Sequence, residues 1–182
     1  MISLSPTYAK FKRISSKQGL YFTLLLLVGL ILSQSCKDNS PYDRLVEKYL
    51  VPYSASADVE VNGVPNPSWL LGVSKYEEGN YDEMVKAFMK LRPGNPFYYK
   101  AHYIMAIVNL QHHKPWKALD NLKATRMNAK GKYFKDAQWL QALAYLQANI
   151  PGRTKDILNR ILREEEPHPY RNQAKELLEQ LP

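Results

Sequence analysis

The sequence contains a single cysteine, Cys36, among 182 residues. One cysteine cannot form an internal disulfide, and it cannot build a thiolate metal cluster. Only eight glycines are present, and none lies in a phosphate-binding loop pattern. The sequence also lacks the His-Glu-x-x-His pattern of zinc hydrolases and a serine in a nucleophile-elbow setting. We therefore expect no catalytic residues, no metal site and no cofactor, and we do not expect an enzyme.

Acidic residues are fewer than basic ones, and much of the imbalance lies at the amino terminus. The chain has 25 Lys and Arg against 17 Asp and Glu, a formal charge of +8. Residues 1–35 carry four of these cations and no acid, so the remaining chain has a charge of only +4. This excess is small and its lysines are scattered, which argues against nucleic acid as a partner.

Long hydrophobic runs are absent except for one at Leu20–Leu32. Its 13 residues are too few for a membrane-spanning helix, which needs about 20. A basic segment precedes the run, an order typical of a secretory signal. The succession of basic segment, apolar run, Ser35 and Cys36 resembles the lipobox region of bacterial lipoproteins.

This resemblance implies that residues 1–35 are a lipoprotein signal peptide, cleaved before Cys36. In that family the cysteine thiol receives a diacylglycerol, so the expected modification is a covalent lipid on Cys36. Each buried methylene contributes about 0.8 kcal/mol, so two or three acyl chains hold a soluble domain at a membrane. We expect an exported, membrane-attached lipoprotein at the outer membrane or periplasmic face, with the cell surface as an alternative location. The alternatives are an uncleaved signal anchor and a signal cut without lipidation.

Residues 36–66 are predicted to form a lipid-anchored tether with one short helix near 41–50. Ser40 is a favourable helix cap, and Pro41 suits the first helical position. Apolar residues then recur at helical spacing as far as Leu50. The rest of the segment has loop composition. We expect the short helix to pack on the domain that follows.

From residue 67 onward the apolar pattern is helical and repeats with a period of 34 to 36 residues. The markers of the first unit are Gly72, Gly79, Tyr81, Met84, Phe88 and Leu91. Their counterparts in the second unit are Ala106, His113, Pro115, Ala118, Leu122 and Thr125, and in the third Ala142, Asn149, Pro151, Thr154, Leu158 and Ile161. Most counterparts keep a similar size or role, but His113 does not match Gly79. A period of this length is typical of stacked helical hairpins.

The first unit, which begins at Trp69, resembles the tetratricopeptide repeat (TPR). The small residue Gly72 would allow the paired helix to approach closely, and Gly79 would end the first helix in the left-handed conformation. Tyr81 and Phe88 would wedge between the two helices. The resemblance implies an all-α fold over residues 67–182, a short α-solenoid of about three TPR-like helical hairpins with a C-terminal capping helix.

The helices of this domain can be placed from the pattern. We predict them at 67–78, 81–92, 97–111, 114–127, 133–148, 152–165 and 169–181. In the TPR family the first helices of successive hairpins line a concave groove that binds a partner. The resemblance therefore implies partner-binding residues Trp69, Val73 and Tyr76 from the first hairpin, Tyr103, Ile107 and Leu110 from the second, and Trp139, Leu143 and Leu146 from the third.

The aromatic ladder of Trp69, Tyr103 and Trp139 leaves two interpretations open. Trp and Tyr are common interface anchors, so the ladder could line a binding groove. Alternatively, it could be core, covered by the helix near 41–50. We expect a membrane-anchored protein–protein interaction or scaffold module of the bacterial cell envelope, with another envelope protein or peptide as partner. The alternative function is a small-ligand or glycan receptor in which the ladder stacks on sugar rings.

Overall fold

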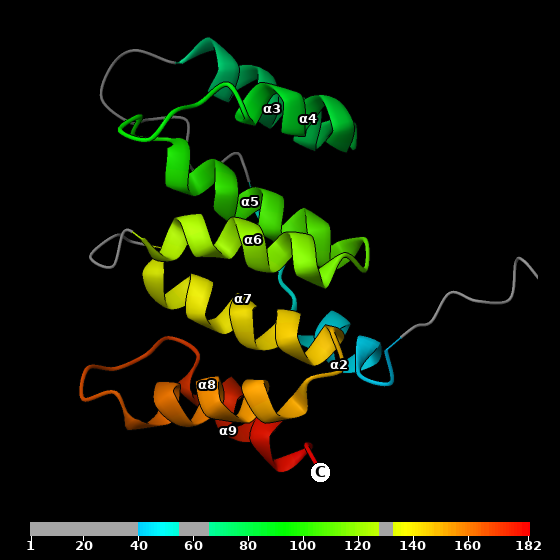
Figure 1. The fold of residues 1–182 in the computed structure, drawn as a ribbon, viewed down its shortest axis with the longest axis vertical. Coiled ribbons are helices and arrows are strands. Elements are labelled where there is room, and N and C mark those ends of the chain that lie inside the picture. The colour runs from blue at the N-terminus through cyan, green and yellow to red at the C-terminus, as the bar shows by residue number, and fades with distance from the viewer. Residues whose placement is uncertain (1–39, 55–65, 128–132) are drawn as a thin grey trace, which may run out of the picture. The chain divides into compact units, whose positions relative to one another are not determined.

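The computed structural model describes residues 40–54, 66–127 and 133–182. These residues form eight α-helices and contain no strand, so the described part of the chain is all-α, as predicted (Figure 1). None of these helices has the length and apolar character needed to cross a membrane. The predicted signal peptide and Cys36 lie outside the described residues.

Six of the helices pair into three successive hairpins. The pairs are α3 (Pro67–Glu77) with α4 (Tyr81–Phe88), α5 (Tyr98–Gln111) with α6 (Pro115–Arg126), and α7 (Phe134–Gln147) with α8 (Pro151–Arg163). Contacts of α4 with α5 and of α6 with α7 place the hairpins side by side in chain order (Figure 1). All predicted helices of this region are present, with boundaries that differ by four residues at most.

The three hairpins share one backbone turn. Gly79, His113 and Asn149 have positive φ angles of 72°, 53° and 59°. In each turn this residue donates its N–H to the carbonyl three residues back, and the next residue donates to the carbonyl five residues back. This pair of bonds is the Schellman ending of a helix. The expectation that His113 does not match Gly79 is therefore wrong for the backbone, because His113 adopts the same left-handed conformation.

Each hairpin also combines a small residue in its first helix with a large one at the matching position of the second. These pairs are Gly72 with Phe88, Ala106 with Leu122, and Ala142 with Leu158, and all six residues are buried. A Cβ atom added to Gly72 would overlap the Cδ1 and Cε1 atoms of Phe88. The predicted close approach at Gly72 is thus confirmed.

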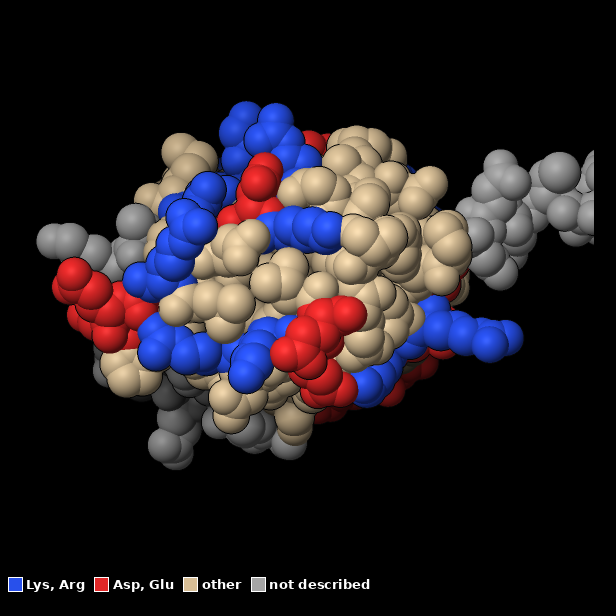
Figure 2. Space-filling view, turned by 90° about the horizontal axis from the view of Figure 1, so that it is seen from below, with Lys and Arg blue, Asp and Glu red and all other residues tan. Residues whose placement is uncertain are grey.

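The last helix, α9 (Arg171–Glu179), packs on α8 after the third hairpin. It buries Ala174 and Leu177, and Leu181 just beyond it is also buried. Seen from this end, acidic and basic side chains are interspersed around an uncharged area (Figure 2). The exposed side of the α8–α9 end therefore carries charged groups of both signs around its uncharged area.

Residues 40–54, which we call the strap, pack on the hairpins. The strap contains α2 (Asp43–Tyr49), which buries Val46 and Tyr49 against the core that includes α7. The helix begins two residues later than Pro41, because the carbonyl of Ser40 accepts a hydrogen bond from the N–H of Asp43 in a preceding turn. The predicted packing of this helix on the domain is confirmed. The described part of the predicted tether is thus docked.

Candidate functional site

The nine residues predicted to contact a partner lie on α3, α5 and α7, the first helices of the hairpins. Six of them are at most 2% exposed, namely Trp69, Ile107, Leu110, Trp139, Leu143 and Leu146. Val73, Tyr76 and Tyr103 are half-buried. These side chains therefore contribute mainly to the core of the described domain.

The aromatic ladder packs against other aromatic rings of the chain. The ring of Trp69 stacks on Phe88 and on Phe97, with centroids 5.3 and 4.8 Å apart. Trp139 stacks on Tyr170 at 5.2 Å and meets the ring of Tyr49 edge-on at 5.8 Å. The two tryptophans are thus held in the interior.

The strap covers two of the three half-buried members of the predicted set, Tyr76 and Tyr103. The ring of Tyr53 meets Tyr76 and Tyr103 edge-on at 6.3 and 6.2 Å, and its carbonyl accepts a 2.9 Å hydrogen bond from the Tyr76 hydroxyl. Burial raises the pKa of the Tyr103 hydroxyl above its ordinary value. Of the two interpretations of the ladder, the core interpretation fits the arrangement seen. The helix near 41–50 covers only Trp139, through Tyr49, whereas Tyr103 meets Tyr53 beyond that helix.

Polar contacts fasten the strap along its length. The Asp43 carboxylate lies 3.2 Å from Nδ1 of His113 in the turn after α5. The Lys48 ammonium pairs with Glu176 of α9 at 2.6 Å, and this hydrogen bond holds the pKa of the exposed Glu176 carboxyl below its ordinary range. The hydroxyl of Ser40 donates to the carbonyl of Leu146 at 3.4 Å. A partner could reach the first helices here only by displacing the strap.

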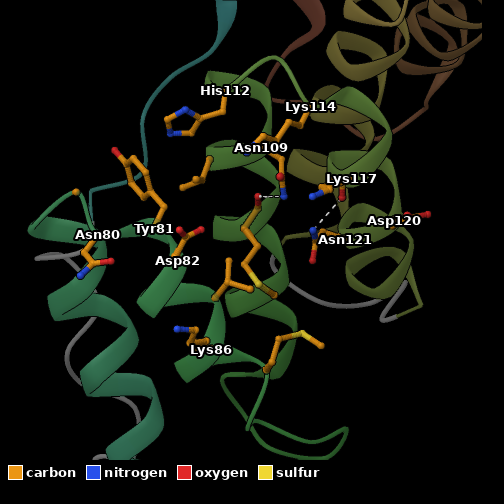
Figure 3. Close-up of a pocket in the computed structure, with 15 residues that line it drawn as sticks. Asn80, Tyr81, Asp82, Lys86, Asn109, His112, Lys114, Lys117, Asp120 and Asn121 are labelled. Atoms are coloured by element: carbon orange, nitrogen blue, oxygen red, sulfur yellow. Dashed lines mark hydrogen bonds between the residues drawn. The ribbon is translucent and has the colours of Figure 1, made fainter. Parts of the chain in front are cut away.

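The second helices carry a groove that the strap does not cover. It lies between α4 and α6, over the C-terminal half of α5, and has a volume of about 780 Å³ (Figure 3). Met105 and Val108 of α5 form part of its lining and are themselves buried. Val85 and Met89, on the α4 side, are 37% and 60% exposed. An apolar strip thus runs along one wall of an open groove.

The other lining residues of this groove are polar and of both charges. They include Tyr81, Asp82, Lys86, Asn109, His112, Lys114, Lys117, Asp120 and Asn121 (Figure 3). Asn109 donates to the carbonyl of Met105 at 2.8 Å, and Asn121 donates to the carbonyl of Lys117 at 2.9 Å. The rings of Tyr81 and His112 meet edge-on at 4.9 Å. Several side chains of the groove are therefore held in place before any partner arrives.

This groove was not predicted from the sequence, because the TPR resemblance implied partner-binding residues on the first helices only. One local signal was available. Val85 of α4 and Met89, the residue that follows its end, are four residues apart. The buried face of α4 is formed by Met84, Ala87 and Phe88. Apolar residues outside the buried stripe of a helix mark a second surface.

The described residues offer no group of three or more His, Cys, Asp or Glu side chains that could hold a metal ion. The chain matches no protein-family model, no curated protein and no solved structure. Its function is therefore inferred from its own sequence and geometry.

Proposed function

We propose that this chain is an exported, lipid-anchored bacterial protein whose TPR-like α-solenoid binds a segment of another envelope protein. Three hairpins with the same turn, and a helix packed on the last of them, support the solenoid, because such arrays are built from stacked repeats with a covered end. The order of basic segment, apolar run and Cys36 supports the lipid anchor. Binding without catalysis is the use that a repeat surface of this kind suits best.

The observation that carries the binding proposal is the open groove between α4 and α6. It combines the exposed apolar side chains of Val85 and Met89 with a rim of polar and charged groups. Protein interfaces have this composition, an apolar centre within a polar rim. We therefore place the partner on the second helices and not on the strap-covered first helices.

The glycan-receptor alternative needs aromatic faces on which a sugar ring can stack. The rings of Trp69 and Trp139 are already stacked on Phe88, Phe97 and Tyr170. This packing favours protein binding over sugar binding.

Replacement of Cys36 by serine tests the anchor. We expect the Cys36→Ser variant to leave the detergent phase when cells are fractionated, because it cannot receive a diacylglycerol. If the variant stays in the membrane fraction, residues 20–32 are the anchor and the lipid part of the proposal is wrong.

Site-specific photo-crosslinking in living cells tests the groove. A photoreactive residue at Met89, 60% exposed on the groove wall, should give a discrete covalent adduct with a partner protein. The same residue at Glu179, exposed on α9 and outside the groove, is the matched control. Equal adducts from the two positions, or none from Met89, would remove the support for partner binding at this groove.

A further inference from the structure

A second groove runs between α6 and α8, beside Gln141 and Tyr145 of α7, and has a volume of about 660 Å³. Four arginines line it, namely Arg126 from α6 and Arg153, Arg160 and Arg163 from α8. The three arginines of α8 lie seven and three residues apart, a spacing that places them on one face of the helix. Asp156 is the only acidic residue that lines this groove.

The positive charge of this groove is largely uncompensated. No ion pair within the described residues involves any of the four arginines. Nη1 of Arg126 donates to Oε1 of Gln141 at 2.8 Å, so this guanidinium is held in place from one side. Its Nε is shielded from solvent and has no hydrogen-bond partner among the described groups. One fixed and three exposed guanidinium groups therefore share one site.

Exposed apolar side chains continue the same groove. An adjoining hollow shares Arg126, Gln141 and Tyr145 with it and extends to Trp116 and Met127. Trp116 is 60% exposed and Met127 is 79% exposed. A segment bound along this surface would meet arginines at one end and apolar side chains at the other.

We propose that this continuous groove binds an acidic peptide segment, rich in Asp or Glu and carrying an apolar side chain, of a partner protein. The planar guanidinium fork matches the two oxygens of a carboxylate. Across both hollows, the four arginines and Lys123 face two acids, Asp120 and Asp156. Trp116 offers the apolar side chain an anchor of the type enriched at interface hot spots. The proposal deepens the docking function proposed above, on which it rests, by naming the chemistry of a second contact.

A binding measurement on the full chain in detergent tests this proposal. The probe is a fluorescein-labelled peptide of glutamates with a central leucine, followed by fluorescence anisotropy. A peptide with glutamine in place of every glutamate is the control probe. We expect saturable binding of the glutamate peptide only, and weaker binding as salt concentration rises.

Two variants that lose the same amount of positive charge distinguish a specific binding site from general electrostatic attraction. Arg153→Gln/Arg160→Gln/Arg163→Gln should weaken binding by about tenfold, since three charge-assisted contacts are lost. Lys90→Gln/Arg92→Gln/Lys175→Gln removes the same charge from exposed positions outside the groove and should leave binding within about twofold. Equal weakening in both variants would overturn the proposal, as would tight binding of the glutamine peptide. Circular dichroism checks that both variants keep the wild-type helix content.

Two further binding measurements identify the kind of ligand that the groove takes. Trp116→Ala should weaken binding of the leucine-containing peptide but not of a peptide of glutamates alone. Arginine-dependent binding to phosphatidylglycerol vesicles, without binding of the peptide, would assign the groove to a membrane surface and overturn the proposal. The crosslink at Met89 is an independent readout, so loss of that adduct with peptide binding retained would refute only the α4–α6 part of the proposed function.

Discussion

Replacement of Gly72 by alanine tests how closely α3 and α4 are packed. A Cβ atom at this position would overlap Cδ1 and Cε1 of Phe88 and lie 3.0 Å from its Cζ. Phe88 is only 2% exposed, and its ring stacks on Trp69 at 5.3 Å. To accept the methyl group, the two helices must separate or the phenyl ring must leave its favoured rotamer.

Two effects of opposite sign determine how much Gly72→Ala changes the free energy of unfolding. Alanine is the better residue in a helix interior by about 1 kcal/mol. Overpacking of a filled core site costs about 1–3 kcal/mol, and overlap with two atoms of a held ring puts this site at the upper end. We expect Gly72→Ala to lower the free energy of unfolding by about 2 kcal/mol, or roughly 5 °C in Tm.

The other two hairpins supply the compensating change, since they combine alanine with leucine at the same positions. Phe88→Leu alone should cost about 1–2 kcal/mol, because ring stacking and packed volume are lost. In Gly72→Ala/Phe88→Leu the smaller side chain makes room for the methyl group. We therefore expect the double variant to be more stable than the sum of the two losses by about 1–2 kcal/mol.

Urea unfolding of the four proteins, followed by circular dichroism and tryptophan fluorescence, measures these free energies. Two results would refute the reasoning. In the first, the free energy of unfolding of Gly72→Ala would equal or exceed that of the wild type, which is the result that helix propensity alone would give. Alternatively, the two single losses could simply add, which would mean that residues 72 and 88 do not compete for space.

Further predictions concern the turns, a buried histidine and the strap. Asn149→Gly should raise the free energy of unfolding by about 0.5–1 kcal/mol in the same urea assay, because glycine adopts the positive φ of 59° without strain. Burial lowers the pKa of the His168 imidazole, so the stability it supports is complete above the ordinary value of about 6.5 and is lost as pH falls below it. The urea concentration at the unfolding midpoint should therefore decrease as the pH is lowered from about 7.5 to 5.5, and His168→Gln should make that decrease smaller. Val46→Asp places a charge at a fully buried position of α2, so the strap should become sensitive to protease while circular dichroism keeps most of the helix signal.

The helical part of the fold could be predicted because its signals are local. Apolar periodicity marks the buried side of each helix, and Pro115 and Pro151 stand at the first residues of α6 and α8. The turn at His113 shows where local reasoning fails. A histidine indicates a positive φ far less strongly than a glycine does. The backbone angle and the two hydrogen bonds of the turn make its equivalence to Gly79 visible.

The candidate sites could not be predicted, because they depend on contacts between distant segments. Ser40 meets Leu146 across 106 positions of the chain, and no local pattern records that pairing. Periodicity indicates that Trp139 is buried, but it does not say that Tyr49 and Tyr170 bury it. The arginine groove likewise needs α6 and α8 to be neighbours before its charges count as one cluster.

The docked strap changes how far the protein could move at a membrane. A free segment of about 30 residues would let the domain range over roughly 30 Å. With the strap docked from Ser40 onward, only residues 37–39 separate that residue from Cys36, a span of at most about 14 Å. Under the proposed lipidation, the short span would therefore hold the domain close to the bilayer through Ser40, which lies beside the α7–α8 turn. A partner would then meet the domain close to the lipid surface.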